Sequence, residues 1–241
     1  AYQHGVGESR FVEEKVHKDK RVELGPNVMF DGERCISCSR CIRFCDEIAK
    51  DPELTFVKRG DKVTITTFPG EQLDNPYSMN VVDICPVGAL TNREFRFKAR
   101  VWDMAHTNTI CNGCARGCNV EVWTRNNEVL RLVPRYNEEV NSYWMCDHGR
   151  LNTFKFINAG DRVDGPHMRV EGNLINVGWD EAFAKAASSL KAFGKDEIAV
   201  LGSAYATVED NFVAAKFARS VLGTGHLDFI RHINSSFGDD I

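Results

Sequence analysis

Four of the nine cysteines of this chain fall within eleven consecutive residues, in the segment CISCSRCIRFC. Three of them, Cys35, Cys38 and Cys41, are spaced at three-residue steps, which lets one tight loop supply three thiolates to a cubane iron-sulfur cluster. In the bacterial ferredoxin pattern C-x2-C-x2-C-x3-C-P, the fourth ligand of such a triplet comes from a distant Cys-Pro pair. The segment DICPVGAL contains that pair. The spacing therefore predicts a 4Fe-4S cluster held by Cys35, Cys38, Cys41 and Cys85.

The last cysteine of the run, Cys45, has no matching partners. In a two-cluster ferredoxin it would serve a second cluster, whose other ligands would lie ten, seven and four residues before Cys85. Those positions hold Asn75, Ser78 and Val81, none of which carries a thiol. We therefore expect Cys45 to be a small buried hydrophobic residue, with a redox role or a role as an alternative ligand as the other possibilities.

A second set of four cysteines follows, in the order Cys111-x2-Cys114-x3-Cys118 and then Cys146. Four thiolates in this arrangement favour a second 4Fe-4S cluster. A zinc ribbon is the alternative here, because it also uses C-x2-C pairs, although the additional x3-Cys does not suit it. Zinc is disfavoured at the first set, because three closely spaced cysteines would crowd one tetrahedral ion.

Several elements between and after the cysteines follow from apolar periodicity and turn residues. A hairpin is predicted over 119–134 around Asn126-Asn127, another over 54–68 near Gly60-Asp61, and a half-buried strand over 92–102. The region after Cys146 is predicted to contain a hairpin through Gly172-Asn173, a helix over 179–193 capped by Asp180, a strand over 198–203, a helix over 207–223 opened by Thr207, and a strand over 226–230. This last strand-helix-strand order predicts a parallel α/β unit.

Composition limits the class of protein. The chain has 241 residues, 43% of them hydrophobic, and contains no apolar run near the about 18 residues that cross a bilayer. Its formal charge of -4 argues against a general nucleic-acid binder, and its odd number of clustered cysteines favours metal-binding thiolates in a reducing cytoplasm. The first residue is not Met and the chain ends just after a strand-like segment, so we expect part of a longer protein.

Several of these segments resemble one family. GVGESRF, CISCSRCIRFCDEIA, DICPVGALT, FRFKARVW and the second cysteine set are similar to the large iron-sulfur subunit of bacterial respiratory complex I, which is the NADH-quinone oxidoreductase subunit designated G. The resemblance implies an α+β ferredoxin-like 4Fe-4S domain over 1–103. It further implies a small β-rich 4Fe-4S domain of the molybdopterin-oxidoreductase type over 104–160, and the start of an α/β molybdopterin-oxidoreductase-like domain over 161–241.

The resemblance also implies a function. In that family, electrons pass from NADH through flavin on a neighbouring subunit and along a chain of clusters toward quinone. The cluster of Cys35, Cys38, Cys41 and Cys85 would belong to that route, and the second cluster would lie off it. The implied partners are the other peripheral-arm subunits, namely the flavin and NADH-binding subunit and the downstream cluster subunits, on the cytoplasmic side of the inner membrane. No nucleic acid is expected, and the membrane is reached only through the complex. An upstream 2Fe-2S region and most of the C-terminal domain would be missing here.

A molybdenum or tungsten formate dehydrogenase, or an NAD-linked hydrogenase, is the main alternative. Formate dehydrogenases share both cysteine motifs, but carry a lysine near the pterin where this chain has His148 in CDHGR. The segment IRHINSSFGDDI offers no cysteine to ligate molybdenum. We therefore expect an electron-transfer subunit with two 4Fe-4S clusters, no molybdopterin and no substrate chemistry of its own.

Overall fold

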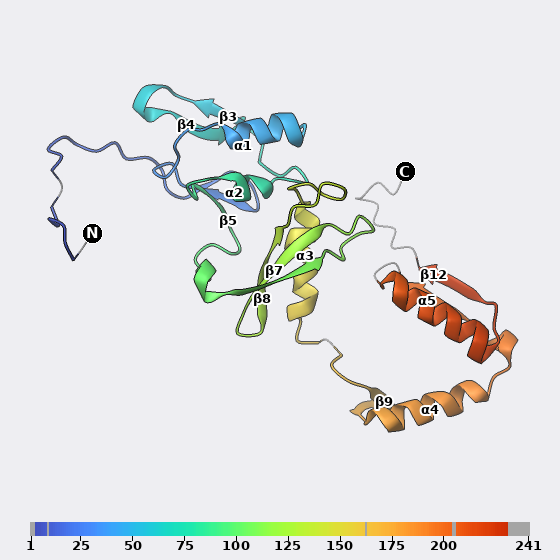
Figure 1. Cartoon of the computed structure of the whole chain (residues 1–241). Helices are drawn as coiled ribbons and strands as arrows, with labels where there is room; N and C mark the ends of the chain where they lie inside the picture. Colours follow the sequence, from blue (N-terminus) through green and yellow to red (C-terminus); the bar gives the residue numbers. More distant parts are fainter. Residues whose placement is uncertain (1–2, 9, 162, 204–205, 231–241) are drawn as a thin grey trace. The chain divides into compact units, whose positions relative to one another are not determined.

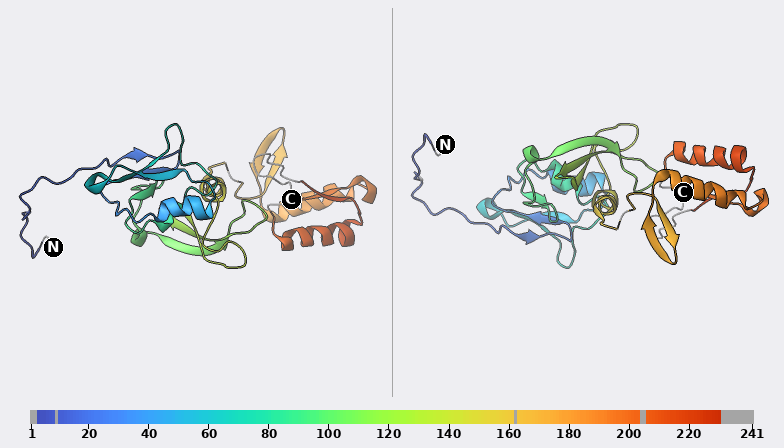
Figure 2. Two further views of the ribbon diagram at one scale, coloured as in Figure 1. Left: turned by 90° about the horizontal axis from the view of Figure 1, so that it is seen from above. Right: turned by 90° about the horizontal axis from the view of Figure 1, so that it is seen from below.

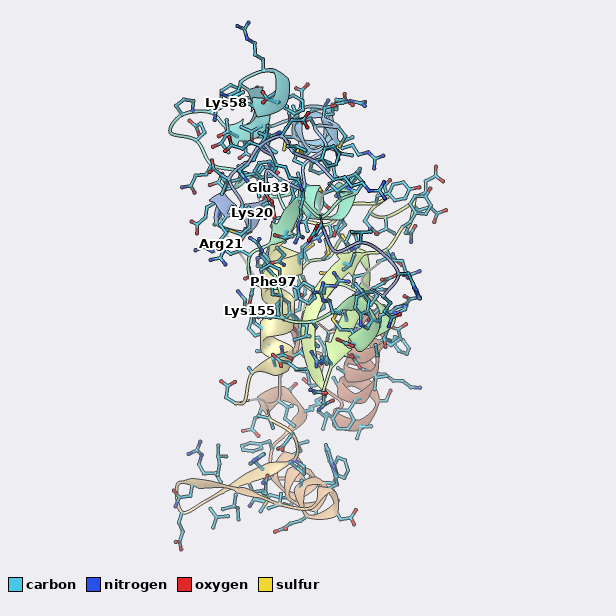
Figure 3. All side chains as sticks on the ribbon, turned by 90° about the vertical axis from the view of Figure 1, so that its left-hand side faces the viewer. Lys20, Arg21, Glu33, Lys58, Phe97 and Lys155 are labelled. Carbon is cyan, nitrogen blue, oxygen red and sulfur yellow. The ribbon has the colours of Figure 1, made fainter. Side chains whose placement is uncertain are left out.

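The structure is a computed structural model that describes residues 3–8, 10–161, 163–203 and 206–230. Figure 1 labels its helices and strands. The chain forms two compact units, one made of residues 1–110 and 118–154 and the other of residues 111–117 and 155–241. The first described residues, up to residue 20, run as an extended segment without helix or strand (Figure 2). Where this segment ends, Lys20 and Glu33 form an ion pair on the surface of the first unit (Figure 3).

The first cysteine set lies in a small α+β layer of the first unit. A three-stranded antiparallel sheet has the order β1-β2-β5, and Phe30 pairs with Leu90 in its register. A separate antiparallel pair, β3-β4, forms the hairpin predicted over 54–68. The elements are β1 Val22–Glu23, β2 Val28–Phe30, α1 Arg40–Arg43 with a following π-helical turn Phe44–Ile48, β3 Leu54–Val57, β4 Thr64–Thr67, α2 Asn80–Ile84 and β5 Leu90–Asn92.

One apolar core joins these elements. Along β2, Val28 and Phe30 are buried and the intervening Met29 is only partly so, which is the two-residue alternation expected of a sheet with one covered face. The two helices contribute to the same core, α1 and its π-helical extension through Cys41 and Phe44, and α2 through Val81. Packing therefore anchors α1, which carries Cys41, and α2, which directly precedes Cys85.

A second antiparallel sheet in the first unit has the order β6-β7-β8, with β6 at Ala105–Ile110, β7 at Asn119–Arg125 and β8 at Glu128–Pro134. The predicted hairpin over 119–134 is confirmed. Asn126 and Asn127 both adopt positive φ, 52° and 62°, as a two-residue turn of this hand requires. Helix α3, Asp147–Asn158, begins directly after Cys146.

The predicted strand over 92–102 is wrong. The strand β5 ends at Asn92, whose side-chain oxygen accepts hydrogen bonds from the backbone N–H groups of Glu94 at 2.8 Å and Phe95 at 3.2 Å. These local bonds stabilise a turn and compete with an extended ladder. The chain then passes through Phe97, which has a φ of 65° and a side chain that is exposed on the surface (Figure 3). A short 3-10 helix, Val101–Asp103, follows.

The second unit begins its regular structure with the predicted hairpin, formed by β9 His167–Val170 and β10 Asn173–Asn176. Its turn residues are Glu171 and Gly172, both with positive φ, so the turn lies one residue before the predicted pair. Helix α4 covers Trp179–Lys191 and is capped by Gly178. The prediction of Asp180 as the cap is wrong, because Asp180 already lies in the first turn, where its charge favours the positive end of the helix dipole.

The α/β part of the second unit is confirmed. Strands β11 Val200–Ser203 and β12 Leu227–Ile230 pair in parallel, and α5 Val208–Phe217 connects them, beside the strands in Figure 1. Thr207 caps α5 by accepting a hydrogen bond from the Asp210 N–H at 3.1 Å, and Asp210 bonds back to it. Gly223, with a φ of 71°, ends the helical segment. Among the described residues, no helix has both the length and the apolar character needed to cross a membrane.

Candidate iron-sulfur centres

The structure brings the four cysteines of the first predicted set together. Cys35, Cys38, Cys41 and Cys85 all line one cavity, although Cys85 is distant from the others in sequence. The remaining lining residues are mostly apolar: Phe30, Ile36, Arg40, Ile65, Pro86, Val87, Ala89 and Leu90. Four sulfur donors around an apolar hollow match the ligand chemistry of a 4Fe-4S cluster, whose irons bind thiolates.

The loop that carries three of these cysteines is shaped by two residues in the left-handed region. Ser37 has a φ of 54° and Ser39 a φ of 61°, and α1 begins directly after Ser39. Alternation of this kind directs successive backbone N–H groups toward one side of the chain and forms an anion-binding concavity. The Ser37 N–H already donates to Cys35 Sγ at 3.4 Å. The loop therefore offers both sulfur ligands and amide donors to a negatively charged cluster.

The surroundings of Cys41 disfavour its thiolate form. Burial raises the pKa of Cys41 to about 11, the Ile42 amide opposes that rise, and the neighbouring Cys35 and Cys38 add to it. Thiolates packed this closely repel one another in an apolar cavity. Bound iron would supply the positive charge that stabilises four neighbouring thiolates, with release of their protons. The four cysteines of the first set therefore suit a 4Fe-4S cluster.

Cys45 lies apart from this cavity. It does not line the hollow, it is completely buried in the apolar core, and burial raises the pKa of its thiol to about 12. The expectation that it is a small buried hydrophobic residue is confirmed. A thiol with so high a pKa is a poor ligand or nucleophile at neutral pH, because both roles require the thiolate.

The three positions that would complete a second ferredoxin cluster are filled by packing and hydrogen bonds. Val81 is completely buried, and Ser78 Oγ donates to Asp147 at 2.6 Å. The Asn75 side chain donates through Nδ2 to the carboxylate of buried Glu53 and accepts at Oδ1 from the Tyr77 N–H at 3.0 Å. These three side chains are therefore committed to the core and its polar contacts, in agreement with the sequence.

The second cysteine set is divided between the two units. Cys111 and Cys114 belong to one unit and Cys118 and Cys146 to the other. Cys111 and Cys118 are buried, Cys114 is exposed and Cys146 is half-buried. The second cluster site stays a prediction, supported here by local geometry alone.

That local geometry repeats features of the first loop. The Gly113 N–H donates to Cys111 Sγ at 3.4 Å, and the Gly149 N–H donates to Cys146 Sγ at the same distance. Gly117 has a φ of 63°, which turns the chain just before Cys118. The amides of Gly113 and Gly149 therefore make, at the second set, the same kind of N–H to Sγ contact that Ser37 makes at the first.

Within the first unit, the segments that carry Cys118 and Cys146 are tied together. The Asn119 N–H donates to Asn141 Oδ1 at 2.9 Å, and Asn141 Nδ2 donates to the Trp144 carbonyl at 3.2 Å. Asn119 follows Cys118 directly, and Trp144 lies two residues before Cys146. One buried asparagine thus joins the two chain segments.

A buried polar network that the sequence reasoning missed connects α2 with the start of α3. Asp147 accepts hydrogen bonds from Ser78 Oγ and from the Met79 N–H, the latter at 2.9 Å, and burial raises the pKa of its carboxyl to about 6. Arg150 reaches Asp83 across the same boundary. The partners lie 67 to 69 residues apart in the sequence, so no local pattern identifies them.

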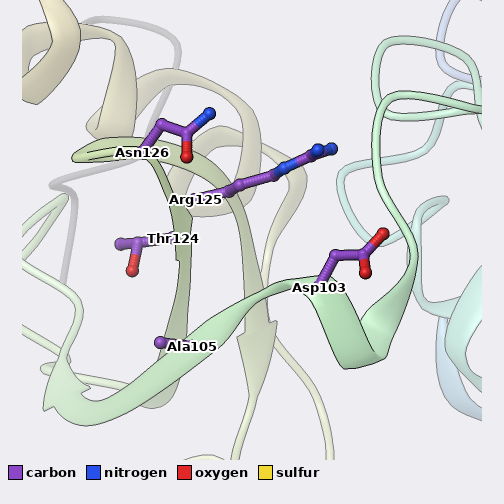
Figure 4. A pocket seen from close by; sticks show the side chains of 5 residues that line it. All are labelled: Asp103, Ala105, Thr124, Arg125 and Asn126. Atoms are coloured by element: carbon purple, nitrogen blue, oxygen red, sulfur yellow. The ribbon is translucent and has the colours of Figure 1, made fainter.

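Two further features lie outside the cavity of the first cysteine set. His148 is half-buried, and its Nδ1 lies 3.2 Å from Asn152 Nδ2. A hollow beside β6 and β7 is lined by Asp103, Ala105, Thr124, Arg125 and Asn126, without a thiol or imidazole (Figure 4). Among the described residues, no group of three or more His, Cys, Asp or Glu side chains is arranged to hold a single metal ion. The segment after residue 230, in which the sequence offers no cysteine for molybdenum, lies outside the described residues.

Comparison with known families matches three consecutive parts of the chain. Residues 25–91 match the ferredoxin-like domain of NADH-quinone oxidoreductase subunit 3. Residues 104–153 match the 4Fe-4S domain described as NADH-ubiquinone oxidoreductase NDSU1/NuoG-like, and residues 162–238 match molybdopterin oxidoreductase. The order of these matches confirms the predicted fold classes.

Individual relatives are similar over nearly the whole chain. The NADH-quinone oxidoreductase subunit designated G in Streptomyces coelicolor is 36% identical over 98% of the chain. Its counterpart of the same designation in Rickettsia bellii is 37% identical over 92%, and NADH-quinone oxidoreductase subunit 3 of Thermus thermophilus is 39% identical over 92%. The chain spans only 28% to 32% of the length of these relatives.

Proposed function

We propose that this chain, which belongs to the family of large iron-sulfur subunits of NADH-quinone oxidoreductase, is an electron-transfer segment of a respiratory complex I. It carries two 4Fe-4S clusters in this proposal. Cys35, Cys38, Cys41 and Cys85 hold the first, and Cys111, Cys114, Cys118 and Cys146 hold the second. The observation that carries the proposal is the cavity lined by all four cysteines of the first set.

When bound, a 4Fe-4S cluster accepts and releases one electron, and the chain's own residues position and tune it. The thiolates fix the cluster between the loop of α1 and the residue that follows α2. Backbone amides such as that of Ser37 donate to the sulfurs and stabilise their negative charge. Apolar side chains such as Phe30 and Ile65 exclude water, because both are buried beside the cavity. No residue of the cavity is needed for bond chemistry on a substrate.

The wider assignment follows from the family. We place the ferredoxin-like domain at 1–103, the second cluster domain at 104–160 and the α/β domain at 161–241. The partners are the flavin and NADH-binding subunit and the downstream cluster subunits of the peripheral arm, on the cytoplasmic side of the inner membrane. Electrons run from NADH toward quinone through the first cluster, whereas the second lies off that route.

Metal analysis of the anaerobically purified chain tests this function. Two cubane clusters predict about eight irons and about eight inorganic sulfides per chain, with no stoichiometric zinc, molybdenum or tungsten. A variant that replaces Cys85 by serine is expected to lose about four of the irons, because the cavity then lacks one thiolate. Stoichiometric molybdenum or tungsten would instead support the formate dehydrogenase alternative, and stoichiometric zinc would support a structural metal protein.

A further inference from the structure

Arg150 forms an ion pair with Asp83, which lies two residues before Cys85 of the first cysteine set. Arg150 has a side chain only 5% exposed, and its Nη2 donates to Asp83 Oδ2 at 2.6 Å and to Asn80 Oδ1 at 3.3 Å. Its Nε has no hydrogen-bond partner among the described residues. A guanidinium cannot be deprotonated in a protein, so Arg150 keeps its positive charge in this interior position.

The pair lies between two cysteines that the proposed function makes cluster ligands. Asp83 is two residues before Cys85, and Arg150 is four residues after Cys146. Both ends are fixed, because Asn80 Nδ2 donates to the Met145 carbonyl at 2.9 Å and Asn80 Oδ1 accepts from the Met145 N–H at 3.2 Å. These bonds hold the segment before Cys85 against the segment before Cys146, where the ion pair forms.

A second guanidinium, that of half-buried Arg131, lies near the pair. Arg131 is flanked by aromatic rings, with its guanidinium carbon 4.7 Å from the Trp123 centroid and 4.8 Å from the Phe95 centroid. Burial lowers the pKa of Arg131, and the charges of both Asp83 and Arg150 act on it. Solvent screens the charge of buried Arg150 less than that of a fully exposed side chain, whereas Asp83 is partly open to solvent.

We propose that Arg150 and Asp83 set the midpoint potential of the cluster held by Cys35, Cys38, Cys41 and Cys85, acting in opposite directions. This inference rests on the proposed function. The positive charge of Arg150 favours the electron that reduction adds to the cluster, and the negative charge of Asp83 opposes it. Net charge and hydrogen bonding near a cluster are among the properties that determine its potential. Arg150 is thus a positioning and tuning residue contributed by the helix of the second cysteine set.

Two substitutions separate this electrostatic role from a structural one. Arg150→Gln and Asp83→Asn break the same 2.6 Å contact but remove opposite charges. We expect Arg150→Gln to lower the midpoint potential of the first cluster and Asp83→Asn to raise it, in anaerobic redox titrations of the purified chain followed by electron paramagnetic resonance. The first-cluster signal is identified as the one that disappears in Cys85→Ser. A merely structural contact would shift both variants in the same direction or in neither.

Arg43→Gln is the matched control. Arg43 lies two residues after Cys41 and also pairs with a carboxylate, Glu47, at 2.8 Å, but its side chain is 66% exposed. The substitution removes the same charge from a solvated position, so the potential is expected to stay unchanged. Arg150→Lys, which keeps the charge, is expected to retain a potential closer to the wild-type value than Arg150→Gln does.

The outcomes distinguish this inference from the proposed function. Absence of a cluster signal in the wild-type chain would overturn the proposed function itself. A cluster signal with potentials that do not move in opposite directions in Arg150→Gln and Asp83→Asn would overturn the inference alone. If Arg150→Gln fails to fold, the rise expected in Asp83→Asn decides, because Asp83 is 28% exposed and its amide analogue retains an oxygen that accepts from Arg150.

Discussion

Replacing Cys45 by serine separates a core cysteine from a cluster ligand. Cys45 is completely buried, packs in the same apolar core as Phe30 and Val81, and does not line the cavity of the other four cysteines. Cys45→Ser puts a hydroxyl group into that core. Burying a hydroxyl without a compensating hydrogen bond costs about 1–3 kcal/mol.

The expected result is a loss of stability without a loss of iron. For a chain of this size, each kcal/mol lowers the midpoint of thermal unfolding by about 2–4 °C. Circular dichroism of the anaerobic protein at a fixed heating rate measures that shift, and iron analysis of the same sample measures cluster content. Cys45→Ala is the control, since alanine buries no polar group and is expected to lose less stability than serine.

The iron content decides whether Cys45 is a cluster ligand. If Cys45→Ser lost about four irons per chain while remaining folded, Cys45 would be a ligand and the assignment of Cys85 to the first cluster would be wrong. Cys85→Ser gives the opposite expectation, with iron lost.

Three other predictions concern the scaffold. Asn127, with a φ of 62° in the β7-β8 turn, is expected to tolerate Asn127→Gly, whereas Asn127→Val lowers the free energy of unfolding by about 1–2 kcal/mol in denaturant titrations. Burial raises the pKa of the Glu53 carboxyl above its ordinary 4.5, so the folded state binds the carboxyl proton more tightly than the unfolded state does. The free energy of unfolding is therefore expected to fall as the pH rises above 4.5. Glu53→Gln is expected to flatten that part of a stability-pH curve, and an unchanged slope would contradict the assignment. Thr207→Ala removes the cap of α5 and is expected to lower the free energy of unfolding by about 0.5–2 kcal/mol. Faster hydrogen exchange in the first turn of α5 would localise that loss. Ser188→Ala, an exposed substitution in α4, is the control.

The first cysteine site was predictable because short spacings in the sequence identify its ligands. Three ligands lie on one loop, and the fourth is marked by its Cys-Pro context, in keeping with the cavity that Cys35, Cys38, Cys41 and Cys85 line. The β7-β8 hairpin was predictable for a similar reason, because the Asn126-Asn127 pair specifies the turn locally. Patterns of this kind need no knowledge of distant contacts.

The features that the sequence did not predict depend on competing local hydrogen bonds or on contacts between residues far apart in the chain. Residues 92–102 alternate like a strand, but the side chain of Asn92 bonds the following backbone amides and ends β5 there. The contacts between Asp83 and Arg150 and between Ser78 and Asp147 join residues 67 and 69 positions apart, and only the packing of α2 against α3 brings them together. A single sequence carries no signal for such pairs.

The proposed electron-transfer function depends most on two cubane clusters held by two separate sets of four thiolates. Low-temperature electron paramagnetic resonance of the anaerobically reduced chain tests this directly, in the wild type and in Cys85→Ser and Cys118→Ser. Two 4Fe-4S signals are predicted, of which Cys85→Ser loses one and Cys118→Ser the other. A wild-type chain with no cubane signal, or with both signals unchanged in Cys85→Ser, would contradict the account.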